Sequence, residues 1–109
     1  MLFRQAMQVI ARRTLKQFWE RYPSAEGPLR AWFAVVSQAE WRGPADVKRR
    51  FGTTVDFVAD NRLIFDLSGN KYRLVVHVSY AFGRVLVKFV GTHSDYNRID
   101  PGTVTWRRR

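Results

Sequence analysis

The chain contains no cysteine among its 109 residues. Disulfide scaffolds, cysteine-ligated zinc, iron–sulfur clusters and thiol nucleophiles are therefore excluded. The sequence also has no P-loop, GxGxxG or GxSxG motif, so phosphate-cradling loops and serine-triad hydrolysis find no support. Its nine acidic residues include no pair spaced for glycoside hydrolysis or for a two-metal centre. We expect neither a cofactor nor a metal.

Long hydrophobic runs are missing as well. No stretch approaches the roughly 20 apolar residues that a transmembrane helix requires. The first seven residues are too short and too polar for a signal peptide. Together with the lack of cysteine, these features predict a cytoplasmic protein without a membrane partner. Residues 1–6 are a candidate dispensable extension, because the first patterned segment begins directly after Met7.

Acidic residues are scarce relative to basic ones: nine Asp and Glu stand against 19 Lys and Arg, a formal net charge of +10. The basic residues occur in both halves of the chain, so a basic tail is not the source of the net charge. Residues 101–109 form such a short basic tail, which ends with Arg107–Arg109. We expect residues 1–109 to form one domain, because this length suits a single core and 15% of the residues are aromatic. Such a charge favours a polyanionic partner, which could be RNA, DNA, an anionic membrane surface or an acidic protein.

The first half of the chain has the spacing of amphipathic helices. Apolar residues recur at positions i, i+3, i+4 and i+7 in two runs, 15–22 and 29–36. Thr14 and Ser24 are the expected N-caps, and Pro23 is expected to end the first helix. Because almost no chain joins the two runs, they predict an antiparallel helical hairpin. A short strand over 8–11 and a short basic helix over 44–51 complete this half.

The second half changes to the alternating pattern of strands. Segments 53–58, 62–67, 71–79 and 84–90 are rich in β-branched and aromatic residues, and turn residues separate them. Short joints imply antiparallel neighbours and hence a meander. Helices first and strands later indicate an α+β fold, in which the helical pair covers one face of the sheet.

Alternation along the strands assigns basic side chains to the opposite face of that sheet. The expected members of this cationic face are Arg62, Lys71, Arg73 and Lys88. Cations on a rigid sheet suit a phosphate backbone, and arginine adds bidentate contacts. The plainer interpretation, ordinary solvated charges, is the better one for any single member.

A histidine and a tyrosine follow the last strand. His93 and Tyr96 are three residues apart, so a helical turn would place them side by side. Beside a phosphate-binding face they could move protons while a ribose 2′-OH attacks the adjacent phosphate, with cations stabilising the phosphorane. A capping or surface histidine and a core tyrosine remain the structural alternatives.

The motifs GNKYRL (69–74) and FVGTHSDY (89–96), with segments 13–19 and 28–32, resemble the HigB family of bacterial toxins. The resemblance implies a RelE-like fold: an N-terminal strand and a two-helix hairpin packed on a twisted antiparallel sheet. It also implies an mRNA interferase that acts on the ribosome and is neutralised by a HigA-type helix-turn-helix antitoxin. The antitoxin complex, and not the toxin alone, would bind operator DNA.

By position, the resemblance makes His93, Tyr96 and Arg73 the candidate catalytic residues. It assigns binding of the RNA phosphates to four further residues: Asn61, Arg62, Lys71 and Lys88. Two other functions stay open at this point. One is a toxin of the same fold that acts on DNA gyrase, and the other is a basic nucleic-acid-binding module without catalytic activity.

Overall fold

The computed structural model describes residues 6–105, so the expectations placed on residues 1–5 and on Arg107–Arg109 lie outside the described residues. The elements follow in the order β1 (Gln8–Ile10), α1 (Arg12–Arg21), η1 (Pro23–Ala25), α2 (Glu26–Gln38), α3 (Pro44–Phe51), η2 (Gly52–Thr54), β2 (Val55–Val58), β3 (Arg62–Leu67), β4 (Tyr72–Ser79), β5 (Arg84–Thr92) and α4 (His93–Tyr96). The predicted α+β class, with helices first and strands later, is confirmed.

The helical hairpin forms as predicted, but its caps differ from the prediction. Helix α1 begins at Arg12 after an extended Ala11, so Thr14 lies within the helix and is buried instead of capping it. Helix α2 begins at Glu26, because Pro23 first tightens the chain into the turn η1. Ser24 lies in this turn, and its hydroxyl is hydrogen-bonded to the hydroxyl of Tyr72 in β4. Both capping predictions are therefore wrong.

The five strands form one sheet in the order β1-β5-β4-β3-β2. Strands β2 to β5 are antiparallel neighbours, which confirms the meander. Strand β1 returns to pair in parallel with the start of β5, from Gln8 opposite Arg84 to Ile10 opposite Leu86. The sheet is therefore mixed, and β1 covers only the first third of the β5 edge.

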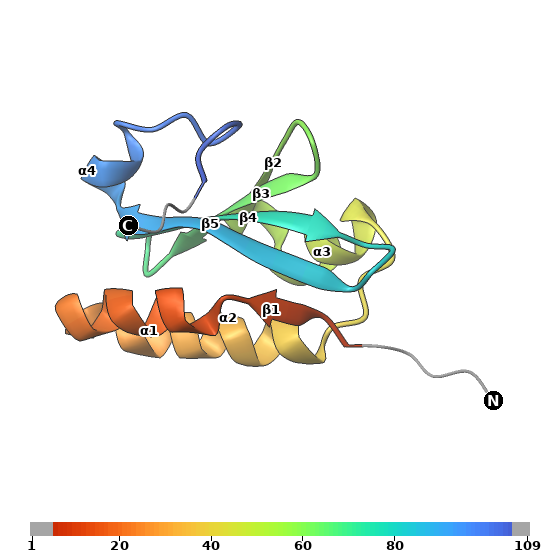
Figure 1. Ribbon diagram of the computed structural model, residues 1–109, viewed down its shortest axis with the longest axis horizontal. Helices are drawn as coiled ribbons and strands as arrows, with labels where there is room; N and C mark the ends of the chain where they lie inside the picture. Colours follow the sequence, from red (N-terminus) through yellow and green to blue (C-terminus); the bar gives the residue numbers. More distant parts are fainter. Residues whose placement is uncertain (1–5, 106–109) are drawn as a thin grey trace.

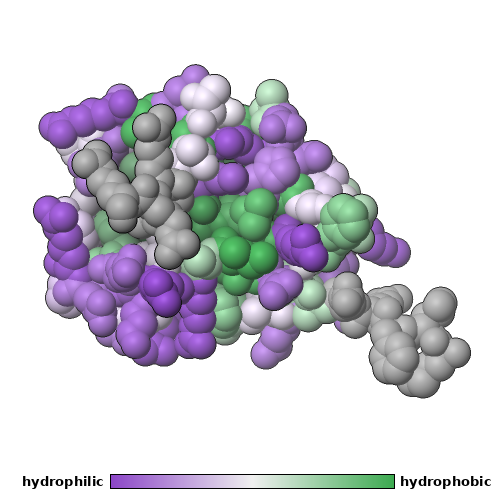
Figure 2. Space-filling model, in the orientation of Figure 1, coloured by the Kyte–Doolittle hydropathy of each residue, from purple (hydrophilic) through white to green (hydrophobic). Residues whose placement is uncertain are grey.

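The sheet is covered on both faces. Figure 1 shows α1 and α2 packed along one face and α4 with the described C-terminal residues on the other, and Figure 2 shows hydrophilic side chains over the outer side of α1. The core on the helical side takes alternate residues of the strands, as predicted; its fully buried side chains include Leu15, Leu29, Val36, Leu63, Phe65, Leu74, Val76, Val78 and Val85. Ile64 and Val75 on the opposite face are buried too. That face is thus only partly open to solvent.

A β-bulge interrupts the alternation in β5. Val75 of β4 is opposite Phe89 and Val76 is opposite Val87, which leaves Lys88 without a register partner. Beyond the bulge Val90 belongs to the core and Phe89 lies on the opposite face, because the extra residue shifts the alternation by one position. The expectation of strict alternation through residue 90 is wrong at this point.

Candidate functional site

Arg73 is held at the start of β4 by a set of polar neighbours. Its Nε–H donates a hydrogen bond to Asn70 Oδ1 at 2.7 Å, and Asp66 Oδ1 lies 2.9 Å from the same nitrogen. Asp66 is directly opposite Arg73 in the β3–β4 register. The Arg73 side chain is only 13% exposed, so its guanidinium has little freedom to reorient. It is a fixed positive charge on the face opposite the helices.

Tyr96 packs its ring against this guanidinium. The Arg73 Cζ atom lies 4.8 Å from the centroid of the Tyr96 ring, within the range of a cation–π interaction. Burial raises the pKa of the Tyr96 phenol above its ordinary value of 10.0, and the charges of Asp56 and Asp66 act in the same direction, although Arg73 opposes them. The phenol is protonated at neutral pH, as it would be at its ordinary pKa, and it has a proton to donate.

Helix α4 places His93 on the same turn as Tyr96, as predicted. The Thr92 hydroxyl caps this turn by accepting from the N–H of Asp95 at 3.1 Å. The backbone N–H of His93 donates to Lys71 O at 3.1 Å, which ties the turn to the start of β4. Asn97 Nδ2 lies 3.3 Å from His93 Nδ1, so Nε2 is the ring nitrogen left for a substrate. The Asn97 amide offers a donor and an acceptor, and can hold Nδ1 in either tautomer.

A glycine makes room for this arrangement. Gly91 is opposite Arg73 in the β4–β5 register. A Cβ atom at Gly91 would lie 2.6 Å from the Phe89 ring and 3.2 Å from the Asp95 Cβ. The Phe89 ring can therefore fold over this part of β5, where its centroid lies 6.4 Å from that of Tyr96. The missing side chain at residue 91 lets α4 close down on the strand.

Known proteins that are similar to this chain are toxins of one family. Residues 25–99 match the HigB toxin family, described as the RelE-like toxic component of a toxin-antitoxin system. The chain belongs to the HigB toxin family. An mRNA interferase HigB of Escherichia coli O6:H1 is 20% identical over 94 residues, 85% of this chain and 91% of that protein. The mRNA interferase toxin HigB of Escherichia coli K12 and an mRNA interferase HigB of Shigella flexneri are each 26% identical over 92 residues, 84% of this chain and 88% of theirs.

In this member of the HigB toxin family, Lys71 does not share the face of Arg73. Its ammonium lies 3.4 Å from the Ser24 hydroxyl, in the turn between α1 and α2, and 5.6 Å from the centroid of the Tyr72 ring. Lys71 precedes β4 and belongs to the hairpin turn, so strand alternation does not govern its direction. The expectation that Lys71 points away from the helices is wrong.

Arg62 is on the expected face but is covered. Its side chain is 8% exposed, and its Nη1 donates to Pro101 O at 3.1 Å and to Val104 O at 2.6 Å. The C-terminal segment therefore lies across Arg62 and uses its guanidinium as an anchor. The expectation of an open cation at Arg62 is wrong, because residues 101–104 return to the sheet and cover this side chain.

The other two predicted phosphate-binding residues are not among the neighbours of Arg73. We call Arg73 with Asp66, Asn70 and Tyr96 the Arg73 cluster. Asn61 lies in the β2–β3 turn, where its carbonyl accepts from the N–H of Val78. It precedes Arg62, which is four residues, or about 13 Å of strand, away from Asp66. Lys88 occupies the bulge, and within residues 6–105 its ammonium has no ion-pair or hydrogen-bond partner. Lys88 thus remains available to a ligand.

Three polar residues of the site were not predicted as members: Asp66, Asn70 and Asn97. The first two follow from the β3–β4 hairpin, because a four-residue turn with Leu67 opposite Tyr72 places Asp66 opposite Arg73. The loop length was visible in the sequence, but the register was not. Asn97 lies one helical turn after His93, and this i, i+4 spacing was the available signal.

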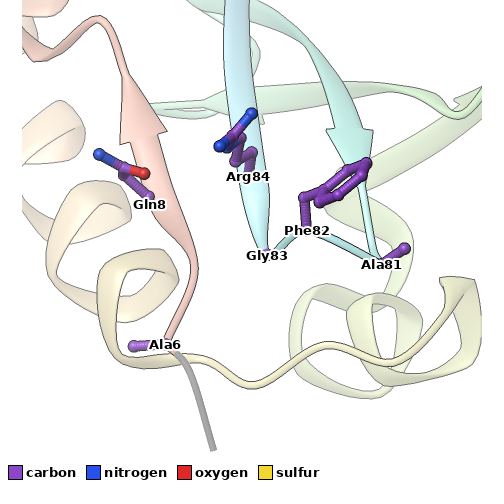
Figure 3. A pocket seen from close by; sticks show the side chains of 6 residues that line it. All are labelled: Ala6, Gln8, Ala81, Phe82, Gly83 and Arg84. Carbon is purple, nitrogen blue, oxygen red and sulfur yellow. The ribbon is translucent and has the colours of Figure 1, made fainter.

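A hollow lies at the end of the sheet away from Arg73, at the β4–β5 turn. Its volume is about 300 Å³, and Gln8, Phe82 and Arg84 are among its lining residues (Figure 3). Phe82 is 68% exposed, and the Arg84 Cζ atom is 5.5 Å from its ring centroid. None of these residues belongs to the Arg73 cluster.

Within residues 6–105 no helix is long and apolar enough to cross a membrane.

Proposed function

We propose that the chain is an endoribonuclease toxin that cleaves messenger RNA on the ribosome. The observation that carries the proposal is the packing of the Arg73 guanidinium on the Tyr96 ring, with His93 on the same turn as Tyr96. This set joins a fixed cation to two groups able to exchange protons. The printed names of the relatives, mRNA interferases, support the same reaction class.

The reaction is an intramolecular transfer at phosphorus. The ribose 2′-oxygen forms a bond to the adjacent phosphorus while the bond from phosphorus to the leaving 5′-oxygen breaks. The products are a 2′,3′-cyclic phosphate and a free 5′-hydroxyl. Negative charge grows on the non-bridging oxygens during this step, and a guanidinium is the side chain best matched to them. Arg73 supplies that charge without a metal ion.

Two protons move in this reaction. Tyr96 donates one to the leaving 5′-oxygen, because its phenol carries a proton at neutral pH and its ring packs on the Arg73 guanidinium that holds the phosphate. His93 takes the other from the 2′-hydroxyl through Nε2, the ring nitrogen that Asn97 leaves free. The Asn97 amide supports this role by accepting from Nδ1–H after a half-turn of the amide group. In this proposal Tyr96 is thus the general acid and His93 the general base.

The partners follow from the family. Members of a toxin-antitoxin system are paired with an antitoxin. We expect that antitoxin to be a HigA-type helix-turn-helix protein that binds operator DNA when in complex with the toxin. We expect the toxin itself to act in the cytoplasm. The net charge of +10 favours contacts with ribosomal RNA that are lost as salt increases.

The test is cleavage of defined messages. The purified chain is added to ribosomes carrying a message, and the new ends are mapped by primer extension. The new ends are checked for the 2′,3′-cyclic phosphate, and a parallel reaction contains the message without ribosomes. Ends that carry the cyclic phosphate and form when ribosomes are present support the proposal. Intact message together with cleaved DNA in cells that express the chain would favour the gyrase alternative.

A further inference from the structure

A hollow lies on the other side of α4, between this turn and helix α1. Figure 1 shows α4 and α1 on opposite sides of the end of β5, which pairs with β4 on one edge but extends beyond β1 on the other. The volume of the hollow is about 420 Å³, within the range of about 300–1,000 Å³ typical of small-molecule sites. It is lined by Gln17, Phe18, Arg21 and Tyr22 of α1, Val90 of β5 and Asp95 of α4.

One wall of the hollow is aromatic and rigid. The rings of Phe18 and Tyr22 are stacked, with centroids 4.7 Å apart and an angle of 30° between their planes. Tyr72 packs edge-on against Phe18 at 5.7 Å and is itself buried. Because Phe18 and Tyr22 pack partly buried against the core, they give this wall a preformed apolar surface against which a planar ligand can lie.

The remaining walls carry three polar side chains without protein partners. Within residues 6–105, the Gln17 amide and the Asp95 carboxylate have no hydrogen-bond or ion-pair partner, and the Arg21 guanidinium contacts only the Tyr22 ring, at 5.6 Å. Asp95 is nevertheless held in place, because its backbone N–H is bonded to the Thr92 hydroxyl. An acceptor, a donor and an amide thus converge on a flat apolar wall.

These groups fit a nucleobase better than a phosphate. The Asp95 carboxylate repels phosphate, but it can accept from both N1–H and the N2 amino group of guanine. Arg21 can donate to O6 or N7 of the same base, and the ring can stack on the aromatic wall. Adenine lacks the paired donors on this edge. The groups of the hollow are therefore complementary to guanine.

We propose that this hollow binds the guanine base of the nucleotide next to the scissile phosphate. The inference rests on the proposed function, because Asp95 precedes Tyr96 on α4 and so joins the hollow to the proposed proton donor. Tyr96 meets the phosphate on the Arg73 side, and Asp95 meets the base on the α1 side. Helix α4 then lies between the phosphate, which reacts, and the guanine base, which is recognised.

The experiment compares messages that differ by one base at the nucleotide next to the cut. Guanine, inosine and adenine are placed there in turn, and single-turnover rates are measured with the wild-type chain, Asp95→Asn and Arg21→Gln. The control is Lys16→Gln, which removes one charge from the exposed side of the same helix and does not line the hollow. Thermal unfolding of each variant shows whether it is folded.

We expect the wild-type chain to prefer guanine over adenine by about 10-fold or more, with inosine between them because it lacks the N2 amino group. Asp95→Asn should bring this ratio close to one, and Arg21→Gln should lower it. Lys16→Gln should leave the ratio unchanged. A ratio that is the same in all four proteins would overturn the inference while leaving the nuclease function intact.

A second readout does not depend on cleavage. Guanosine and adenosine monophosphates are titrated into the isolated chain, and the resonances of the Phe18 and Tyr22 rings are followed by NMR. Shifts with the guanine nucleotide that disappear in Asp95→Asn support the hollow even if no message is cut. The absence of shifts in the wild-type chain, or equal shifts with both nucleotides, would count against a guanine site whatever the fate of the nuclease proposal.

Discussion

Replacing Arg73 by alanine should damage RNA cleavage far more than it damages folding. The change removes a hydrogen bond to Asn70, an ion pair with Asp66 and the packing on Tyr96. A hydrogen bond with a charged partner contributes about 1.5–3 kcal/mol and a cation–π contact about 0.5–1 kcal/mol, less where water reaches the groups. We expect a net loss of about 1–3 kcal/mol in the free energy of unfolding.

The expected loss of activity is larger. A fixed donor aimed at developing negative charge is worth a factor of about 10²–10³ in rate. A domain of this size has about 5–15 kcal/mol of stability, so Arg73→Ala remains folded at 25 °C and its activity can be measured. Arg73→Lys keeps the charge but loses the planar fork, and it should fall between the wild-type chain and Arg73→Ala.

The double variant Asp66→Ala/Arg73→Ala separates the two roles. Removing Asp66 as well relieves the carboxylate that Arg73→Ala leaves without its cation, so part of the lost stability should return. Cleavage should not return with it. The measurements are thermal unfolding and single-turnover cleavage on the same preparations. If activity recovered along with the melting temperature, Arg73 would be a structural residue and the reasoning would be refuted.

Four further results are expected. His93→Ala and Tyr96→Phe should each lower cleavage by about 10²-fold while ribosome binding, measured by co-sedimentation, persists; equal losses of binding would refute their proton-transfer roles. Because burial raises the pKa of Tyr96 above 10.0, its contribution to stability is full below that pH and is lost as the pH rises through the folded pKa, so Tyr96→Phe should flatten the alkaline fall in chemical denaturation experiments. Arg62→Ala should cost about 2–3 kcal/mol and expose residues 101–104 to hydrogen exchange, a result that an open phosphate-binding arginine would not give. Gly91→Ala should cost about 1–3 kcal/mol, because its Cβ would displace the Phe89 ring; an unchanged melting temperature would contradict that close contact.

Periodicity was sufficient to predict the helices and the antiparallel strands. Leu29 and Val36 are buried where the helical spacing placed them, and Leu63 and Phe65 face the helices as alternation required. These patterns repeat along each element, so a single exception does not hide them. The parallel pairing of β1 with β5 was not predicted, because three residues carry no signal for a partner some 75 residues away.

The candidate site was predicted in part. The sequence led to Arg73, His93 and Tyr96. The structure brings Arg73 and Tyr96 into contact and places His93 on the same turn as Tyr96. Arg62 and Lys71 were misplaced for different reasons. A segment distant in the sequence folds back over Arg62. Lys71 lies in a turn, where the alternation of side-chain direction found in strands does not apply. Neither event leaves a local pattern in the chain.

The bulge at Lys88 has a consequence for the way the last strand ends. Since one residue is inserted into β5, everything after it is turned over relative to the strand before it. Deleting Lys88 would restore regular pleating and deliver Tyr96 to the side of the sheet where α1 lies. A single supernumerary residue thus decides on which side of the molecule the chain emerges, and with it whether the tyrosine can reach the arginine.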